Sequence, residues 1–213
     1  MTAEYEIEPV RGLPAELPPG ETILWQGAPA WRALARRMFR LRLVAGYFAI
    51  LLAWRLLEAR GDMAAATGAI VTTIAMAAAA VAVLGFIAWA MARATVYTIT
   101  NRRLVIRSGV AIPMIVNVPF RAVASASVRL HGDGTGDLPL VMKDGDGIAY
   151  LAVWPNARPH RFAQAEPMLR CVPDAEEVAR ILGRALAAAA DQQVRPSVSD
   201  AGHAPARTAA AIA

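Results

Sequence analysis

The sequence feature that most constrains the fold is an apolar stretch from Met63 to Ala92. Its thirty residues include no charge and no proline, and three threonines are its only polar side chains. A helix of this length runs roughly 45 Å, more than the roughly 30 Å hydrocarbon core of a bilayer. A soluble chain of 213 residues has too little core to surround such a helix on all sides. The stretch therefore predicts a membrane-spanning helix.

A second, shorter apolar segment covers Leu43 to Leu57 and carries Arg55 near its far end. Taken alone, it fits either a spanning or a re-entrant helix. Arginines flank both outer ends of the pair, and the positive-inside rule then places both flanks in the cytoplasm. We therefore expect a two-helix transmembrane hairpin over 43–92 in the inner (intracytoplasmic) membrane, with both termini cytoplasmic. The turn Glu58–Asp62 would lie outside, with Arg55 snorkelling towards it.

The residues before the hairpin predict two further pieces. Pro14, Pro18, Pro19 and Pro29 indicate an extended N-terminal segment, 1–30, and no signal peptide is recognisable. The next stretch, 31–42, places Trp31, Leu34 and Met38 on one helical face and arginines on another. Such a helix is either an ordinary surface helix or an interfacial helix on an anionic leaflet. Its position beside a membrane segment favours the second.

The periodicity changes after Arg93 from helical to strand-like. Residues 95–100 and 103–109 read as a β-hairpin, and 110–120, 121–130, 138–143 and 148–154 read as further strands. Asp174 and Glu177 mark the start of a C-terminal helix with an apolar stripe, connected to the sheet by a stiff linker over 167–173. The fold class predicted for 93–190 is a small antiparallel β sandwich or barrel with a C-terminal helix. Residues 191–213 are expected to be a disordered tail.

Two parts of the sequence resemble known families. LPPGETILWQGAP before two apolar helices, followed by VYTITNRRLVIRSGV, resembles the bacterial pleckstrin-homology-like (PH-like) membrane proteins. The later stretch WPNARPHRFAQAEPMLRCVPDAEEVARILGRAL is similar to the photosynthetic complex assembly proteins encoded beside the reaction-centre H subunit in purple phototrophic bacteria. This resemblance implies a cytoplasmic PH-like domain. It also implies a membrane-bound assembly factor needed for reaction-centre and core-complex formation, without being a lasting component of either.

The sequence contains no recognisable catalytic or metal-binding motif, so we expect neither an enzyme nor a metal site. His131, His160 and His203 lie in a loop, a proline-flanked segment and the tail. The Asp- and Gly-rich links 131–137 and 144–147 lack the length and closing glutamate of a calcium loop. No histidine lies in either apolar helix to hold a magnesium porphyrin, so no cofactor is expected, while transient pigment handling stays open. Nucleic-acid binding is not expected, because aromatic side chains are not interleaved with the basic ones.

Three sets of candidate site residues follow. Lipid headgroup contacts are predicted for Arg32, Arg36, Arg37, Arg40, Arg102 and Arg103, with solvated strand faces as the equal alternative for the last two. Helix packing against a partner helix or a second copy is predicted for small residues of the long helix, namely Gly68, Ala75, Ala79 and Gly85. Partner docking is predicted for Trp154, Arg158, His160, Arg161, Phe162, Met168 and Leu169, with a loop packed on its own sheet as the alternative.

Two functions remain open from the sequence. The first is a non-catalytic membrane assembly factor or chaperone that contacts reaction-centre subunits or core-complex intermediates. The second is a PH-like membrane protein that senses or binds anionic lipid or oligomerises as a scaffold.

Overall fold

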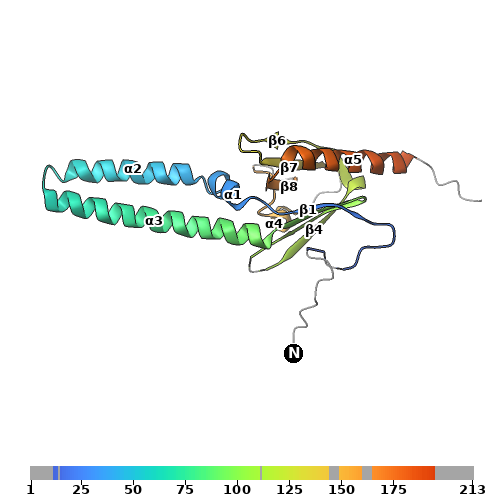
Figure 1. The fold of residues 1–213 in the computed structure, drawn as a ribbon, viewed down its shortest axis with the longest axis horizontal. Helices are drawn as coiled ribbons and strands as arrows, with labels where there is room; N and C mark the ends of the chain where they lie inside the picture. The colour runs from blue at the N-terminus through green and yellow to red at the C-terminus, as the bar shows by residue number, and fades with distance from the viewer. Residues whose placement is uncertain (1–11, 14, 111, 144–148, 160–164, 195–213) are drawn as a thin grey trace, which may run out of the picture.

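The computed structural model describes residues 12–13, 15–110, 112–143, 149–159 and 165–194. A long rod of two antiparallel helices projects from one end of a β domain, and the two parts share no long linker (Figure 1). The predictions for residues 1–11, 144–148, 160–164 and 195–213 lie outside the described residues.

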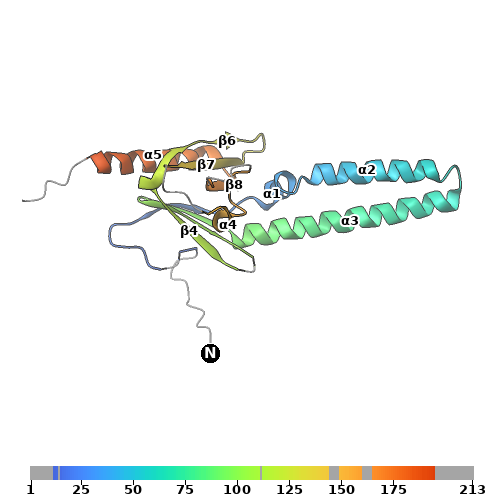
Figure 2. The same cartoon turned by 180° about the vertical axis from the view of Figure 1, so that it is seen from behind.

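The rod consists of α2 (Leu41–Glu58) and α3 (Met63–Ala94), which lie side by side in both views (Figures 1 and 2). Asp62 begins α3, because its Oδ1 accepts hydrogen bonds from the backbone N–H groups of Ala64 and Ala65 at 2.9 and 3.2 Å. The helical hairpin and its short turn therefore match the sequence prediction as geometry.

Within the described residues, α3 alone is long and apolar enough to cross a membrane by length and composition. Only 6% of its most apolar 18-residue window is buried in the protein, so α3 is not the core helix of a soluble fold. By contrast, α2 carries Arg42, Arg55 and Glu58 within its 18 residues. Membrane crossing is accordingly supported for α3, and a second crossing by α2 is a separate hypothesis.

The first sheet contains four antiparallel strands in the order β1-β2-β3-β4. These are β1 (Ile23–Gly27), β2 (Val96–Thr100), β3 (Arg103–Ser108) and β4 (Met114–Pro119). Strand β1 pairs with β2 from Ile23 opposite Thr100 to Gly27 opposite Tyr97. The N-terminal segment is thus not merely an extended approach to the membrane. The helical rod is an insertion between two neighbouring strands of one sheet, so the domain predicted to begin at residue 93 begins before the rod.

The second sheet is built around β7 (Gly136–Met142), which pairs with β5 (Val123–Ala126), β6 (Arg129–Leu130) and β8 (Met168–Val172). A 3-10 turn, η1 (Phe120–Ala122), connects the sheets. Two predictions were wrong here. The end of the segment predicted as a strand over 148–154 is a short helix, α4 (Tyr150–Val153), and the supposed linker over 167–173 is strand β8. Both segments are apolar, and short apolar runs do not distinguish helix, strand and linker.

The last element, α5 (Ala175–Val194), covers the core formed between the two sheets. Val178, Leu182 and Ala185 of its predicted stripe are buried, and Ile181 and Leu186 pack partly against the same core. The predicted C-terminal helix is therefore confirmed, but it continues to Val194 rather than ending before the tail predicted from 191. The core's largest members from the sheets are Tyr97, Ile99, Leu104, Ile106, Leu138, Leu140 and Leu169.

The predicted helix is present as α1 (Trp31–Arg37), and part of its apolar face packs against the protein. Ala33, Leu34 and Ala35 are buried, and Leu34 belongs to a cluster with Ala92 of α3 and Cys171 of β8. The helix ends before Arg40, whose left-handed backbone (φ 48°) begins α2. Helix α1 lies on the domain surface because it connects β1 to α2, which lies beside α3. The apolar side chains of α1 pack against α3 and β8 there.

Candidate functional site

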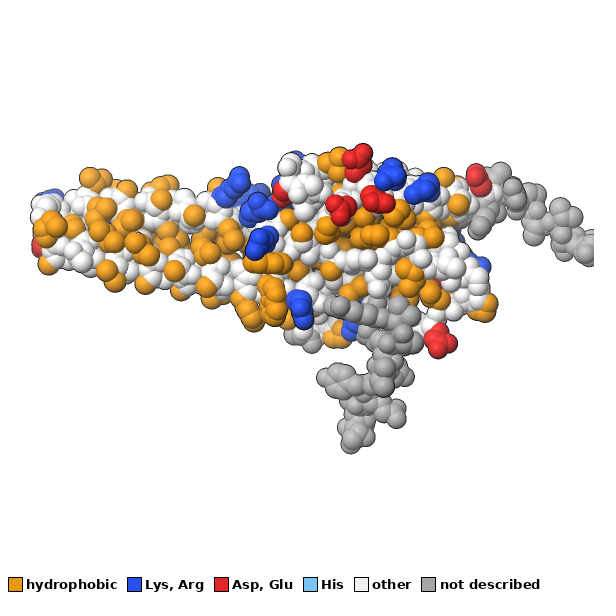
Figure 3. Space-filling view, viewed as in Figure 1, with side chains coloured by type: hydrophobic (Ala, Val, Ile, Leu, Met, Phe, Trp, Pro, Cys, Tyr) orange, Lys and Arg blue, Asp and Glu red, His pale blue; other side chains and the backbone are white. Residues whose placement is uncertain are grey.

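The candidate site is the junction between the rod and the β domain. Figure 3 shows apolar side chains along the rod and a group of basic side chains where the rod meets the domain. The chain crosses this junction twice, from β1 into α1 and from α3 into β2, and only Thr95 separates α3 from β2. The backbone N–H of Ala30 also donates to the carbonyl of Cys171 at 2.9 Å. The junction is therefore fastened at several points and holds the domain at a set distance from the rod.

Both arginines predicted in the β2–β3 turn lie at the far end of the sheet. Strand β2 leads away from α3 for five residues, so the turn lies roughly 17 Å beyond the end of the helix. There the guanidinium of Arg103 donates to both carboxylate oxygens of Glu21. Arg102 is exposed at the same end. Arg103 is thus engaged within the fold, and this placement does not support the predicted headgroup contacts of Arg102 and Arg103.

The basic residues of α1 lie at the junction, where two of them bind the loop between β6 and β7. Arg36 and Arg37 each place an Nη2 atom 3.1 and 3.3 Å from the carboxylate of Asp133. Hydrogen bonds from Thr135, together with the charge of Arg37, lower the pKa of Asp133 to about 2. The guanidinium of Arg32 lies 5.4 Å from the ring centroid of Trp31. The Asp- and Gly-rich loop thus holds α1 in place.

Asp137, in β7, also makes contacts that support the fold. Its Oδ1 accepts the backbone N–H of Cys171 at 2.8 Å, and its Oδ2 lies 3.1 Å from Nε2 of His131. Cys171 has a left-handed backbone (φ 48°) and a buried thiol, whose pKa burial raises to about 12. A thiol that stays protonated is a poor nucleophile. These groups support β8 against α1. Within the described residues, no three His, Cys, Asp or Glu side chains gather as a metal site.

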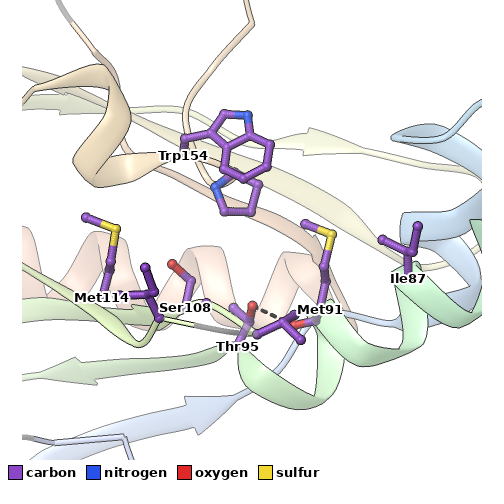
Figure 4. Close-up of a pocket in the computed structure, with 10 residues that line it drawn as sticks. Ile87, Met91, Thr95, Ser108, Met114 and Trp154 are labelled. Atoms are coloured by element: carbon purple, nitrogen blue, oxygen red, sulfur yellow. Dashed lines mark hydrogen bonds between the residues drawn. The ribbon is translucent and has the colours of Figure 1, made fainter.

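An apolar cleft of about 400 Å³ opens at the junction beside α3 (Figure 4). Ile87 and Met91 of α3 form one wall, Met114 of β4 lies on the opposite side, and Trp154 covers the opening. The loop before β4 adds Val110 and Ile112, which are 61% and 75% exposed. Sequence patterns do not indicate this cleft, because its walls come from three separate segments. Its apolar surface continues the exposed face of α3.

The predicted docking segment divides into two groups. Trp154 is 54% exposed and lines the cleft, and Arg158 is partly exposed, with its Nη1 donating to the buried carboxylate of Glu166 at 2.8 Å. Met168 and Leu169 are buried in β8 and present no surface to a partner. The prediction for these two was wrong because the segment over 167–173 is a core strand. His160, Arg161 and Phe162 lie outside the described residues.

The predicted packing residues of α3 do not face its neighbour within the chain. The buried face of α3 includes Ala69, Thr73, Ala88 and Ala92, at helical spacing. In contrast, Gly68, Ala75 and Ala79 are exposed and Gly85 is half-buried. A Cβ atom added at Gly68 or Gly85 would meet nothing within 4 Å. Small residues cover several faces of this helix, so the sequence could not show which face meets α2. The predicted packing residues lie on the outward face of α3, away from the rest of the chain.

Arg55 does not extend towards the turn as predicted. Its Nη1 donates to Oγ1 of Thr72 at 2.8 Å and to Oγ1 of Thr73 at 3.3 Å, deeper along the rod. Side chains of a helix tilt towards its N-terminus, and the N-terminus of α2 lies at the domain end. The arginine therefore joins the two helices through hydroxyl groups inside the apolar rod.

Comparisons with known proteins agree with this architecture. The family described as "Bacterial PH domain" matches residues 38–186. A protein of Rhodobacter capsulatus, described as an uncharacterized 23.7 kDa protein in the puhA 5' region, is 38% identical over 186 residues. That alignment covers 85% of this chain and 87% of the relative. No solved structure matches significantly.

Proposed function

Because the chain belongs to the bacterial PH domain family, we propose that its PH-like domain serves a membrane-bound, non-catalytic assembly factor for the photosynthetic reaction centre and core light-harvesting complex. The name of the relative places its gene in the puhA 5' region, a reaction-centre gene region of a purple bacterium. The resemblance of the C-terminal half to assembly proteins encoded beside the reaction-centre H subunit supports the same role.

The observation that carries the proposal is the insertion of the rod between β1 and β2. A domain on a flexible tether would have to be ordered each time a partner bound, and that ordering costs affinity. Here the sheet, α1 and the Asp133 loop hold the domain against the rod before any partner arrives. Such a preorganised surface suits a factor that receives a membrane protein in one orientation.

In this proposal both α2 and α3 cross the inner membrane, with the β domain in the cytoplasm. The arginines at the domain end of the rod support that orientation, because positive charge favours the cytoplasmic side. They are Arg36, Arg37, Arg40, Arg42 and Arg93.

The partner surface in this proposal is the outward face of α3 together with the apolar cleft. The small residues Gly68, Ala75 and Ala79 permit a close approach by another helix. The cleft under Trp154 extends this partner surface around α3, because Ile87 and Met91 of the same helix line it. The partner is a membrane-embedded helix of a reaction-centre subunit or assembly intermediate.

Affinity purification from crosslinked membranes during induction of photosynthesis tests this function. We expect recovery of a reaction-centre L, M or H subunit with the tagged wild-type chain. A variant with Ala75→Leu and Ala79→Leu should recover less, whereas Ile70→Leu, a conservative change on the same helix, should behave as wild type. Absence of all three subunits from the wild-type sample would contradict the proposal.

The alternative function, binding of anionic lipid, is favoured by a second cavity of the junction, which is lined by arginines. The two functions are compatible, because a lipid site would fix the height of the domain at the membrane surface.

A further inference from the structure

The second cavity lies between the α1–α2 link and the second sheet and has a volume of about 480 Å³. Five arginines line it, coming from α1, its link to α2, and the β domain: Arg37, Arg40, Arg129, Arg158 and Arg170. Asp137 is the one carboxylate in the described lining. We propose that this basic cavity binds the phosphate group of an anionic phospholipid from the cytoplasmic leaflet. The inference rests on the membrane placement made in the proposed function.

The carboxylates near the cavity do not neutralise it. Both oxygens of Asp137 are already engaged by the backbone N–H of Cys171 and by His131. Arg37 pairs with Asp133, which also serves Arg36, and Arg158 pairs with Glu166. No carboxylate in the described part of the chain lies within ion-pair distance of Arg40 or Arg129. Positive charge therefore exceeds negative charge around the cavity.

Arg170 adds a positioned donor. Its Nη2 donates to the carbonyl of Ala157 at 2.7 Å, and its Nε is buried without a hydrogen-bond partner among the described groups. The backbone N–H of the same residue donates to the hydroxyl of Tyr97 at 3.1 Å, which fixes the start of the side chain. A buried N–H without an acceptor costs free energy, which an anion would reduce by accepting a hydrogen bond from this Nε.

The chemistry of the lining favours a phosphate on a lipid. Guanidinium groups donate in a planar fork that matches phosphate oxygens. Leu34, Met38 and Pro139 form an apolar part of the same lining, suited to the glycerol and first methylenes of a lipid. The cavity also lies at the domain end of the rod, where Arg40 begins α2 and where headgroups are found if α2 crosses the membrane. Inorganic phosphate would use the arginines but not the apolar wall.

Lipid retention by the full-length protein tests the site. The protein is purified from nanodiscs containing equal phosphatidylglycerol and phosphatidylcholine, washed with delipidating detergent and weighed by native mass spectrometry. We expect retained phosphatidylglycerol in preference to phosphatidylcholine. The variant with Arg40→Gln and Arg129→Gln should retain at least about tenfold less, because each charge-assisted hydrogen bond contributes about 1.5 kcal/mol or more. A control with Arg121→Gln and Arg184→Gln removes the same charge from exposed sites outside the cavity.

The outcomes separate the sources of phosphate. Equal retention of the two lipids, or equal loss in the cavity variant and the control, would overturn the proposal. Loss of retained lipid in millimolar inorganic phosphate, with phosphate bound in its place, would assign the cavity to free phosphate. Unchanged melting temperatures would show that the variants fold, and if the double variant unfolds, Arg129→Gln alone gives the same comparison. None of these readouts involves reaction-centre subunits, so failure of the assembly function would leave the lipid result standing.

Discussion

Arg103 donates from Nε and Nη2 to the two carboxylate oxygens of Glu21 at 2.7 and 2.9 Å, across 82 residues that include the whole helical rod. Next to this pair, Nδ2 of Asn101 donates to the carbonyl of Gly20, and its Oδ1 accepts the backbone N–H of Thr22. The two halves of the sequence motif shared with PH-like proteins are therefore bonded to each other. These bonds help hold β1 beside β2, although the whole rod lies between the two strands in the sequence.

Glu21→Gln should lower the free energy of unfolding by about 2 kcal/mol at neutral pH, because hydrogen bonds to a charged group are lost. Burial raises the pKa of Glu21, but hydrogen bonds from Arg103 and Thr100 and nearby positive charge lower it below 4.5 overall. A lowered pKa means that the stabilisation is present above about pH 4.5 and is lost as the pH falls through the folded-state value. Melting temperatures of wild type and variant should therefore converge in acid. Glu16→Gln, at an exposed position, should show neither effect.

The sequence predicted those elements whose signal is local. The β2–β3 hairpin, the apolar stripe of α5 and the length of α3 all follow from periodicity within one segment. Strand β1 was not predicted because its partner residues lie 70 to 77 positions later, beyond the rod. For the same reason the sequence could not show that Ala92 and Cys171 cover part of the apolar stripe of α1.

The junction was harder to predict than the fold. Arginines were correctly recognised as numerous near the rod, but the sequence could not show that Arg103 lies at the opposite end of a strand. Nor could the sequence show that Arg129, Arg158 and Arg170 line one cavity with Arg40. The pairing of β6, β7 and β8 brings them together.

Asp137 is expected to act as a structural residue and not as a catalyst. Asp137→Ala removes the acceptor for the backbone N–H of Cys171 and should destabilise the domain by about 1–3 kcal/mol, the cost of an unpaired buried donor. Asp137→Asn retains an acceptor oxygen and should lose less. Melting temperature and protein abundance measure both effects. Normal abundance of Asp137→Asn together with complete loss of photosynthetic complexes would point to chemistry instead.

Arg55→Leu should make insertion of α2 more favourable by roughly 1–2 kcal/mol, because an arginine opposes insertion, though less near a helix end than at its centre, while leucine promotes it. Thr72 remains satisfied in this variant, since its hydroxyl also donates to the carbonyl of Gly68 at 2.7 Å. A translocon insertion assay of 41–94 reads the change directly. Arg55→Lys should leave insertion close to wild type. Equal insertion of the leucine and lysine variants would show that α2 does not cross the membrane.

Reporter insertions test the orientation of the rod. A reporter active only in the periplasm should be active when inserted at Gly61, in the turn between α2 and α3, and inactive when placed after Ala94. The reason is the concentration of arginines at the domain end of the rod, which positive-inside topology keeps in the cytoplasm. A cytoplasm-dependent reporter at the same two sites provides the reciprocal control. Periplasmic activity after Ala94 would rule out two crossings.

The final prediction concerns Trp154, which covers the apolar cleft beside α3 (Figure 4). Under the proposed function the partner surface includes the cleft beneath this indole. Trp154→Ala should then weaken copurification of reaction-centre subunits by roughly thirtyfold, the effect of losing about 2 kcal/mol at a central aromatic contact. Leu24→Ala is the matched control, because Leu24 is also an exposed apolar residue, at 44%, but lies in β1 near its end farther from the rod. Trp154 is bonded to the core only through its backbone N–H to the carbonyl of Tyr150 among the described groups, so the truncation should leave abundance in membranes unchanged. Wild-type recovery of subunits by the Trp154 variant would remove the cleft from the partner surface and leave the outward face of α3 as the remaining candidate.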